Sequence, residues 1–223
     1  MAASSNKTAL ILVDIQHDFL PPDGSLAVTD GDQILPPVYR LIENAEKYFD
    51  LVVASLDYHP VSHISFASTH GKEPFTTLEV PKLNSNETIT QMLWPDHCVQ
   101  GTKGCELEPG IMKRLERISR MVEYIKKGDN VAVDAYSAFA DNQYTFFTPL
   151  ARILHAAGVT KVVVCGLATD YCVRATAIDA RKFGFETKLL TDAVRAVDPT
   201  KETDILSELE VWGCQLVESG SIV

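Results

Sequence analysis

The sequence predicts a three-layer α/β/α sandwich built around a mainly parallel, Rossmann-like central sheet. Short, nearly continuous apolar runs recur along the chain, and helical patterns with one apolar face lie between them. Strands appear as continuous apolar runs when helices cover both faces of a parallel sheet, so this alternation favours the α/β class. Hydrophobic residues make up 46% of the 223 residues and charged residues 22%, so the chain can form a full core.

Five apolar runs are expected to form the strands of the sheet. Each is short and rich in β-branched or aliphatic residues, as is typical of buried strands. The last run is the weakest in apolar character. The runs cover residues 9–13, 51–56, 121–125, 161–165 and 186–190.

Helices are expected wherever apolar residues recur at spacings of three and four. Gly158 and Gly184 follow the second and third of these patterns and mark their ends. Asp198 followed by Pro199 is a favourable start for the last helix, and Gly213 follows its last turn. The expected helices cover residues 36–49, 146–157, 172–183 and 198–212.

The stretch from about residue 58 to residue 110 breaks this alternation. It is rich in Ser, Thr, Pro, Gly and His and shows little periodicity. A long irregular region inside a compact domain is usually functional. Since the chain has no linker, low-complexity tract or internal repeat, we expect residues 1–223 to form a single domain.

Charge and cysteine content exclude several classes of protein. Twenty basic and thirty acidic residues give a net charge of −10, which disfavours nucleic acid and anionic membranes as partners. No segment is long enough to cross a bilayer, and the N-terminal apolar run ends at Asp14 without a cleavage site. The five cysteines do not have zinc-site spacing, so we expect reduced thiols and a cytoplasmic protein.

The carboxyl ends of the expected strands carry residues that suit catalysis. Ligands of open parallel sheets bind beyond these ends, so side chains that follow the strands should converge on one edge. A nucleophile, a base and a fixed positive charge would then lie together. These residues are Asp14 after the first strand, Asp57 and His59 after the second, Lys126 or Lys127 after the third, and Cys172 after the fourth.

Cys172 is the candidate nucleophile. It ends a strand-to-helix turn, residues 166–172, and the helix dipole lowers the pKa of a thiol in a first helical turn. Backbone N–H groups of such a turn can stabilise the oxyanion of an amide substrate. The alternative is a small buried residue on an amphipathic helix.

Asp14 and one lysine could act on this thiol. Asp14 ends an almost fully apolar strand, so it is either a cap or a carboxylate held for proton transfer. Burial would raise the pKa of Asp14, and a nearby lysine would lower it. Strand alternation sends Lys126 and Lys127 to opposite faces, so only one should face the site, and both also fit a solvated turn.

Asp57 and His59 are candidate metal ligands because residues two apart in an extended chain lie on the same side. His97, in the long irregular region, would complete a set of one carboxylate and two imidazoles, with water in the remaining positions. Such a set suits Zn²⁺ or Fe²⁺. His63 and, less well, His70 are further candidates.

Five motifs that span nearly the whole chain resemble those of the cysteine hydrolases of the isochorismatase-like superfamily, and within it the nicotinamidases. Their occurrence in this order is far more specific than any one of them. They are LILVDIQHDF at residues 10–19, DYHP at 57–60, WPDHCVQGT at 94–102, KG at 127–128 with YSAF at 136–139, and GLATDYCV at 166–173.

The resemblance implies an amidase that converts nicotinamide to nicotinate and ammonia in NAD salvage, through a thioester intermediate. It implies a triad of Asp14, Lys127 and Cys172, with Lys127 chosen because the family lysine directly precedes a glycine. It also implies an oxyanion hole formed by the N–H groups of Ala168 and Cys172, with a cis peptide before Ala168.

The same resemblance implies how substrate and cofactor bind. Phe19, Trp94 and Tyr136 would form an aromatic slot for the flat pyridine ring. One divalent ion is implied, Zn²⁺ in the first place with Fe²⁺ or Mn²⁺ as alternatives. Pyrazinamide is a further expected substrate, and self-association into a homo-oligomer stays open. The implied metal ligands are Asp57, His59 and His97, with His63 added in some members.

Other functions compete with this one. A metal-independent amidohydrolase of the same superfamily, acting on a carbamoyl or ureido substrate, would generally lack the Asp57, His59 and His97 set. Isochorismatase itself cleaves a vinyl ether without a cysteine nucleophile, so Cys172 argues against it. A dinucleotide-binding protein needs a glycine-rich turn after the first strand, where residues 14–18 include two aspartates. A catalytically inactive scaffold has no need of the triad.

Overall fold

The central sheet of the computed structural model, which describes residues 6–119 and 122–223, has six strands. Their order is β5-β2-β1-β6-β7-β8, and all neighbouring strands are parallel. The parallel sheet predicted from the apolar runs is therefore confirmed. The strands are β1 Lys7–Val13, β2 Leu51–Asp57, β5 Val122–Lys127, β6 Val159–Leu167, β7 Glu186–Arg195 and β8 Gln215–Val217.

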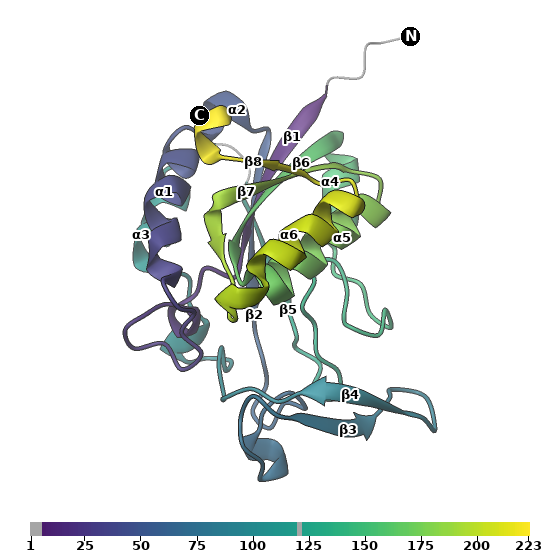
Figure 1. Cartoon of the computed structure of the whole chain (residues 1–223). Helices are drawn as coiled ribbons and strands as arrows, with labels where there is room; N and C mark the ends of the chain where they lie inside the picture. The colour runs from purple at the N-terminus through teal and green to yellow at the C-terminus, as the bar shows by residue number, and fades with distance from the viewer. Residues whose placement is uncertain (1–5, 120–121) are drawn as a thin grey trace.

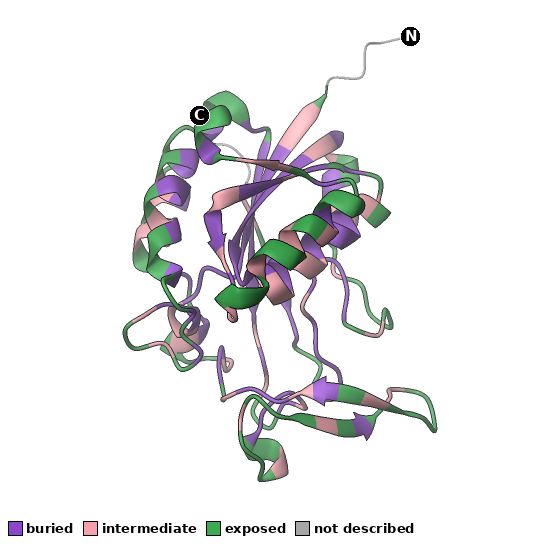
Figure 2. Cartoon of the chain, in the orientation of Figure 1, coloured by how far each residue is buried: buried purple, intermediate pink, exposed green. Residues whose placement is uncertain are grey.

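Helices cover both faces of this sheet, which makes the three layers (Figure 1). Alternate residues of β1 divide between two cores: Leu10 and Leu12 pack on one side, and Ala9, Ile11 and Val13 on the other. These strand residues are buried, whereas the helices expose their outer faces (Figure 2). The first core takes side chains from α1 Leu35–Glu43, α2 Ala45–Tyr48 and α3 Pro109–Leu115, and the second from α4 Leu150–Ala156, α5 Arg174–Lys182 and α6 Glu202–Val211.

All five predicted strands are present, and most of them extend further than the apolar runs. β2 continues to Asp57 and β5 to Lys127, so polar residues of the expected site belong to the strands themselves. Met121, with which the third run was expected to begin, lies outside the described residues. β8 was not predicted, because three residues are too few to show a period.

The predicted helix 36–49 is wrong in its continuity. α1 ends at Glu43, and Asn44, with φ −105° and ψ 8°, separates it from the single turn of α2. The helix predicted over 146–157 begins only at Leu150, after Pro149. Phe146 and Phe147 instead lie in a loop with their aromatic side chains exposed, which the apolar spacing did not distinguish from a helix.

The last two predicted helices are also shorter than expected, and one helix was missed. A π-helical turn, Thr169–Val173, precedes α5, and a 3₁₀ turn, Pro199–Lys201, precedes α6. α3 begins with Pro109 at the end of the long irregular region, where the sequence shows little periodicity.

The long irregular region contains an antiparallel hairpin that the sequence did not predict. β3 Thr77–Pro81 pairs with β4 Thr88–Met92, and the hairpin lies beyond the sheet, at the end of the molecule opposite the C-terminus (Figure 1). Isolated bridges between His59 and Val99 and between Phe66 and Trp94 hold the flanking segments together. Among the described residues, no helix combines the length and apolar character that a bilayer crossing requires.

Candidate active site

Three neighbouring strands deliver the polar residues of the site to one edge of the sheet. β1 pairs with β2 up to Val13 and Ser55, and β2 pairs with β5 up to Asp57 and Lys127. Asp14 follows directly with a positive φ of 49°, so the chain leaves the sheet at this residue. The parallel register thus brings Asp14, Asp57 and Lys127 together, as the strand ends predicted.

Lys127 lies at the centre of this group. Its Nζ atom is 2.9 Å from Asp14 Oδ2 and 3.4 Å from Cys172 Sγ, and it also donates to Asp57 Oδ1. Lys127 is buried, whereas Lys126 is exposed and its ammonium lies 3.7 Å from the centre of the Tyr58 ring. Of the two lysines that the sequence left open, Lys127 therefore faces the site.

Asp14 is a fully buried carboxylate that contacts Ser55, Lys127 and the Cys172 thiol. Ser55 Oγ donates to its Oδ1 at 2.6 Å, and Lys127 pairs with its Oδ2. Burial raises the pKa of Asp14, and this outweighs the lowering by the Lys127 ammonium. Burial would lower the pKa of Lys127, but Asp14 and Asp57 raise it well above its ordinary value. A charged ammonium thus stands beside a carboxylate with raised proton affinity.

Cys172 lies in the π-helical turn between β6 and α5, not in the first turn of an α-helix. Burial raises the pKa of the Cys172 thiol well above its ordinary value, although Lys127 lowers it. The net shift is therefore opposite to the lowering expected from the helix dipole, because removal from water is the larger effect. A thiol held in its protonated form needs a neighbouring base to become a nucleophile. The peptide bond between Leu167 and Ala168 is cis.

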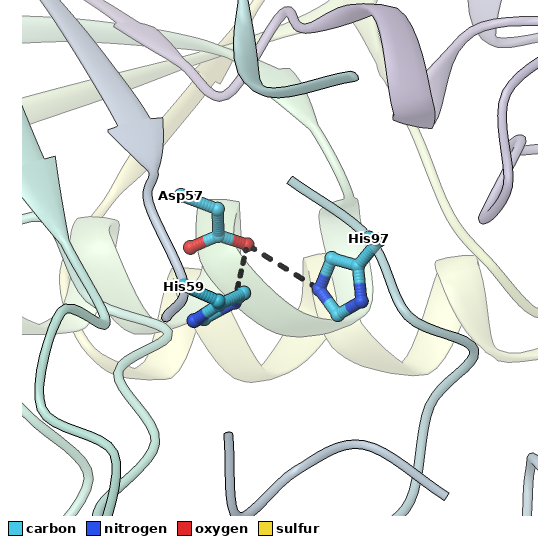
Figure 3. A group of neighbouring side chains, drawn as sticks. All are labelled: Asp57, His59 and His97. Atoms are coloured by element: carbon cyan, nitrogen blue, oxygen red, sulfur yellow. Dashed lines mark ion pairs between the residues drawn. The ribbon is translucent and has the colours of Figure 1, made fainter. Parts of the chain in front are cut away.

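Asp57, His59 and His97 offer ligand atoms that all lie within 4.8 Å of one another. The Nε2 atoms of His59 and His97 are 3.6 Å and 3.8 Å from Asp57 Oδ2. Both imidazole rings therefore direct Nε2 toward the Asp57 carboxylate (Figure 3). Each Nδ1 atom is 2.8 Å from a backbone carbonyl, that of Gly128 or Pro95. A carbonyl at Nδ1 fixes the proton there and leaves Nε2 free to bind a metal, so the three residues fit a divalent ion.

His63 adjoins this group, but both of its ring nitrogens have protein partners. Its Nδ1 atom is 2.7 Å from Ser65 Oγ, and its Nε2 atom is 3.3 Å from the Val133 carbonyl. The ring stacks on His59 with the centroids 4.2 Å apart. Burial lowers the pKa of His63 to about 4. In this arrangement His63 supports the His59 ring. His70 binds the Ile64 carbonyl at 2.8 Å and is not a member of the group.

A cavity opens over Cys172. Phe19, Trp94 and Tyr136, the three aromatic residues expected to hold the substrate, all line it. Trp94 Nε1 lies 3.4 Å from the Tyr136 hydroxyl, and the Trp94 ring meets the Tyr171 ring edge-on with the centroids 4.7 Å apart. The full lining is Phe19, Leu26, Asp57, Trp94, His97, Asp134, Tyr136, Ala168, Tyr171, Cys172 and Val197.

Four of these lining residues were not predicted. Tyr171 directly precedes the candidate nucleophile, so its place in the motif could have indicated it. Asp134 had no such signal, although its carboxylate lies within 4.8 Å of ring nitrogens of His59 and His63. Leu26 and Val197 come from distant segments, and nothing in the sequence links them to the site. Val197 is held there because its N–H donates to the Asp170 carboxylate at 2.9 Å.

A buried thiol, carboxylate and ammonium at the carboxyl edge of a parallel sheet can supply the nucleophile, base and fixed charge of a cysteine hydrolase. The chain belongs to the isochorismatase family, because the isochorismatase domain matches residues 8–219. A nicotinamidase of Acinetobacter baylyi is 42% identical to this chain over 221 residues, which cover 98% of this chain and 96% of the relative.

Two solved structures share the fold over nearly their whole length. The yeast nicotinamidase Pnc1p, solved with the inhibitor nicotinaldehyde, superposes with a TM-score of 0.89 at 33% identity and covers 95% of this chain and 99% of its own. The pyrazinamidase of Pyrococcus horikoshii, solved in complex with zinc, gives a TM-score of 0.75 at 38% identity and covers 95% of this chain and 99% of its own.

Proposed function

We propose that this chain hydrolyses nicotinamide to nicotinate and ammonia, through a thioester on Cys172, in the salvage of NAD. The contacts of one atom carry the proposal: Lys127 Nζ meets Asp14, Cys172 and Asp57 at once. This ammonium joins a base and a thiol to a carboxylate of the candidate metal group. Relatives that bear the name nicotinamidase match over nearly the whole chain, which supports the assignment of this substrate.

The cavity suits a flat ring with one polar substituent. Phe19, Trp94 and Tyr136 supply aromatic surface, which packs well against a pyridine ring. Asp57, His59 and His97 would hold one divalent ion, and the zinc-bound relative makes Zn²⁺ the first candidate. When bound, the ion would fix the ring nitrogen and so orient the carboxamide over Cys172.

Acylation starts from the protonated thiol. Asp14, which forms a hydrogen bond with the Cys172 thiol, takes its proton, while Lys127 stabilises the thiolate. The thiolate attacks the carboxamide carbon, and the N–H groups of Ala168 and Cys172 stabilise the oxyanion. The C–N bond then breaks, and Asp14 returns the proton to the nitrogen, which leaves as ammonia. A nicotinoyl thioester remains on Cys172.

Deacylation uses the same residues in reverse. Asp14 takes a proton from a water molecule, and the hydroxide attacks the thioester carbon. The C–S bond breaks, and the Cys172 thiolate recovers the proton from Asp14. The product acid loses its own proton to solvent and leaves as nicotinate, so the enzyme returns to its starting state.

A substrate panel with metal analysis tests this function. Ammonia release is measured with nicotinamide, pyrazinamide and a ureido compound, and metal content is determined on the same sample. The proposal predicts rapid release from nicotinamide, release from pyrazinamide and about one metal ion per chain. Turnover of the ureido compound alone, by a metal-free protein, would instead support the metal-independent amidohydrolase.

The proposal also covers the domain organisation, the location and the partners of the protein. We expect one hydrolase domain over residues 1–223, a cytoplasmic location and no nucleic-acid or membrane partner. Five free, buried cysteines and the net charge of −10 support these expectations. Gel filtration would establish whether the protein self-associates.

A further inference from the structure

Gln16 has a fully buried side chain whose polar atoms all bind the backbone beside the site. Its Oε1 atom accepts the Asp57 N–H at 2.9 Å. Its Nε2 atom donates to the Asp57 carbonyl at 2.8 Å and to the Cys105 carbonyl at 2.9 Å. Gln16 belongs neither to the proposed triad nor to the candidate metal group. A buried carboxamide with every contact directed to one region indicates a specific task.

The Gln16 carboxamide takes the place of a missing strand residue. The ladder between β1 and β2 ends when the Asp14 N–H binds the Ser55 carbonyl at 3.2 Å, and the chain then turns out of the sheet. A parallel ladder uses the N–H and the carbonyl of alternate residues, so Asp57 is the next residue of β2 to need a partner on this side. The Gln16 carboxamide meets both backbone groups of Asp57, which two successive peptide groups of a longer β1 would otherwise have bound.

Asp57 is the residue through which this contact reaches the chemistry. Its Oδ1 atom accepts from Lys127, and its Oδ2 atom faces the Nε2 atoms of His59 and His97 at 3.6 Å and 3.8 Å. A shift of the Asp57 backbone would therefore move a candidate ligand and a partner of the central ammonium together.

Gln16 also holds the segment that follows His97. Its side chain binds the Cys105 carbonyl, and its backbone forms an isolated bridge with Leu107. Three segments consequently meet at one side chain: the end of β1, the end of β2 and the loop that leads from His97 to α3.

We infer that Gln16 is a positioning residue, whose carboxamide fixes Asp57 and thereby the binding of the metal ion and the orientation of the substrate. It takes no part in proton transfer. The inference rests on the proposed function, because it presumes that Asp57 binds an ion. Residues that orient metal ligands without touching the ion commonly contribute roughly 10–100-fold to metal affinity.

Two variants of similar size test the inference. Gln16→Met removes every polar contact, and Gln16→Glu keeps an acceptor for the Asp57 N–H but loses the donor to both carbonyls. Leu154→Ala is the control, because Leu154 is a fully buried residue of the second core and lies outside the site. Zinc affinity is measured by competition with a chelator, and circular dichroism and thermal unfolding are recorded for each protein.

We expect both Gln16 variants to bind zinc roughly 10–100-fold more weakly than the wild type, with Leu154→Ala unchanged despite its lower stability. At saturating zinc, KM for nicotinamide should rise by a larger factor than kcat falls. Wild-type zinc affinity in both Gln16 variants, or an equal loss in Leu154→Ala, would overturn the inference alone. A wild-type protein that binds no zinc would overturn the proposed metal site together with the inference.

Discussion

Two lysine–carboxylate pairs lie near opposite ends of the strands of the same sheet. Near the amino ends of β6 and β7, Lys161 Nζ is 3.3 Å from Glu186 Oε2, and the two side chains are 36% and 64% exposed. At the carboxyl edge, Lys127 Nζ is 2.9 Å from Asp14 Oδ2, and both side chains are fully buried. The residue types and distances are similar. The pairs differ because only the Lys127–Asp14 pair is excluded from water.

That difference separates a surface ion pair from a reactive one. An exposed pair is screened by solvent and contributes only about 0–1 kcal/mol to stability. The buried pair cannot be screened, so burial and the Lys127 charge together determine the proton affinity of Asp14. The buried pair also contacts Asp57 and the Cys172 thiol, whereas the surface pair has no thiol beside it.

The largest predicted effect is at the Cys172 thiol. Cys172→Ala is expected to lower ammonia release from nicotinamide by roughly 10⁴-fold or more, because no thioester can form. Steady-state assays of the purified variant check this, and circular dichroism checks that it folds. Cys214→Ala is the matched control: Cys214 is also buried in the second core, and its loss should leave kcat near the wild-type value.

Replacing each lysine compares the two pairs directly. Lys127→Met should lower kcat by roughly 10²–10³-fold, because the thiolate loses its stabilising charge. It should also destabilise the fold by about 3–5 kcal/mol, since Asp14 and Asp57 keep buried charges without their partner. Lys161→Met should leave kcat unchanged and alter stability by less than about 1 kcal/mol. Equal effects in the two variants, in urea unfolding and in turnover, would contradict the comparison.

Metal removal is expected to have a smaller effect, which falls mainly on substrate binding. Chelation should raise KM for nicotinamide by roughly tenfold or more, and added zinc should restore it, because the ion orients the ring. His97→Ala should reproduce the loss and resist rescue by zinc. If the metal-free enzyme kept its KM, Asp57, His59 and His97 would have no role in binding.

Of the predicted effects on activity near neutral pH, the effect of changing the pH should be the smallest. Burial raises the pKa of Asp14, and the base must be deprotonated to accept the thiol proton. Activity should therefore be full above the raised pKa and fall as pH decreases through it, so kcat/KM declines at a pH above 3.8, the ordinary value for aspartate. The profile is measured at saturating zinc. A decline that begins only below 3.8 would show that Asp14 is not the base.

The sequence predicted the central sheet well, because strands covered on both faces contain a short, nearly continuous apolar run. It predicted the convergence of Asp14, Asp57 and Lys127 as well, since parallel strand ends share one edge of the sheet. It did not predict the break at Asn44 or the short β8, because both involve too few residues to disturb or establish a period.

Properties that depend on burial could not be predicted from local pattern. The turn of Cys172 suggested a lowered pKa, and only its removal from water in the folded chain shows the opposite. Leu26 and Val197 reach the cavity from segments with no motif. Gln16 lies within a recognised motif, but its role depends on the backbone groups of Asp57 and Cys105, which no sequence spacing identifies.

Trapping the acyl intermediate is the most direct measurement of the chemistry proposed for the carboxyl edge. The enzyme is mixed with excess nicotinamide, quenched in acid during turnover and digested, and its peptides are weighed by mass spectrometry. A single nicotinoyl group on the peptide that contains Cys172, and none on the other four cysteines, is the predicted result. Rapid turnover with no acyl group on Cys172, together with an active Cys172→Ala variant, would contradict it.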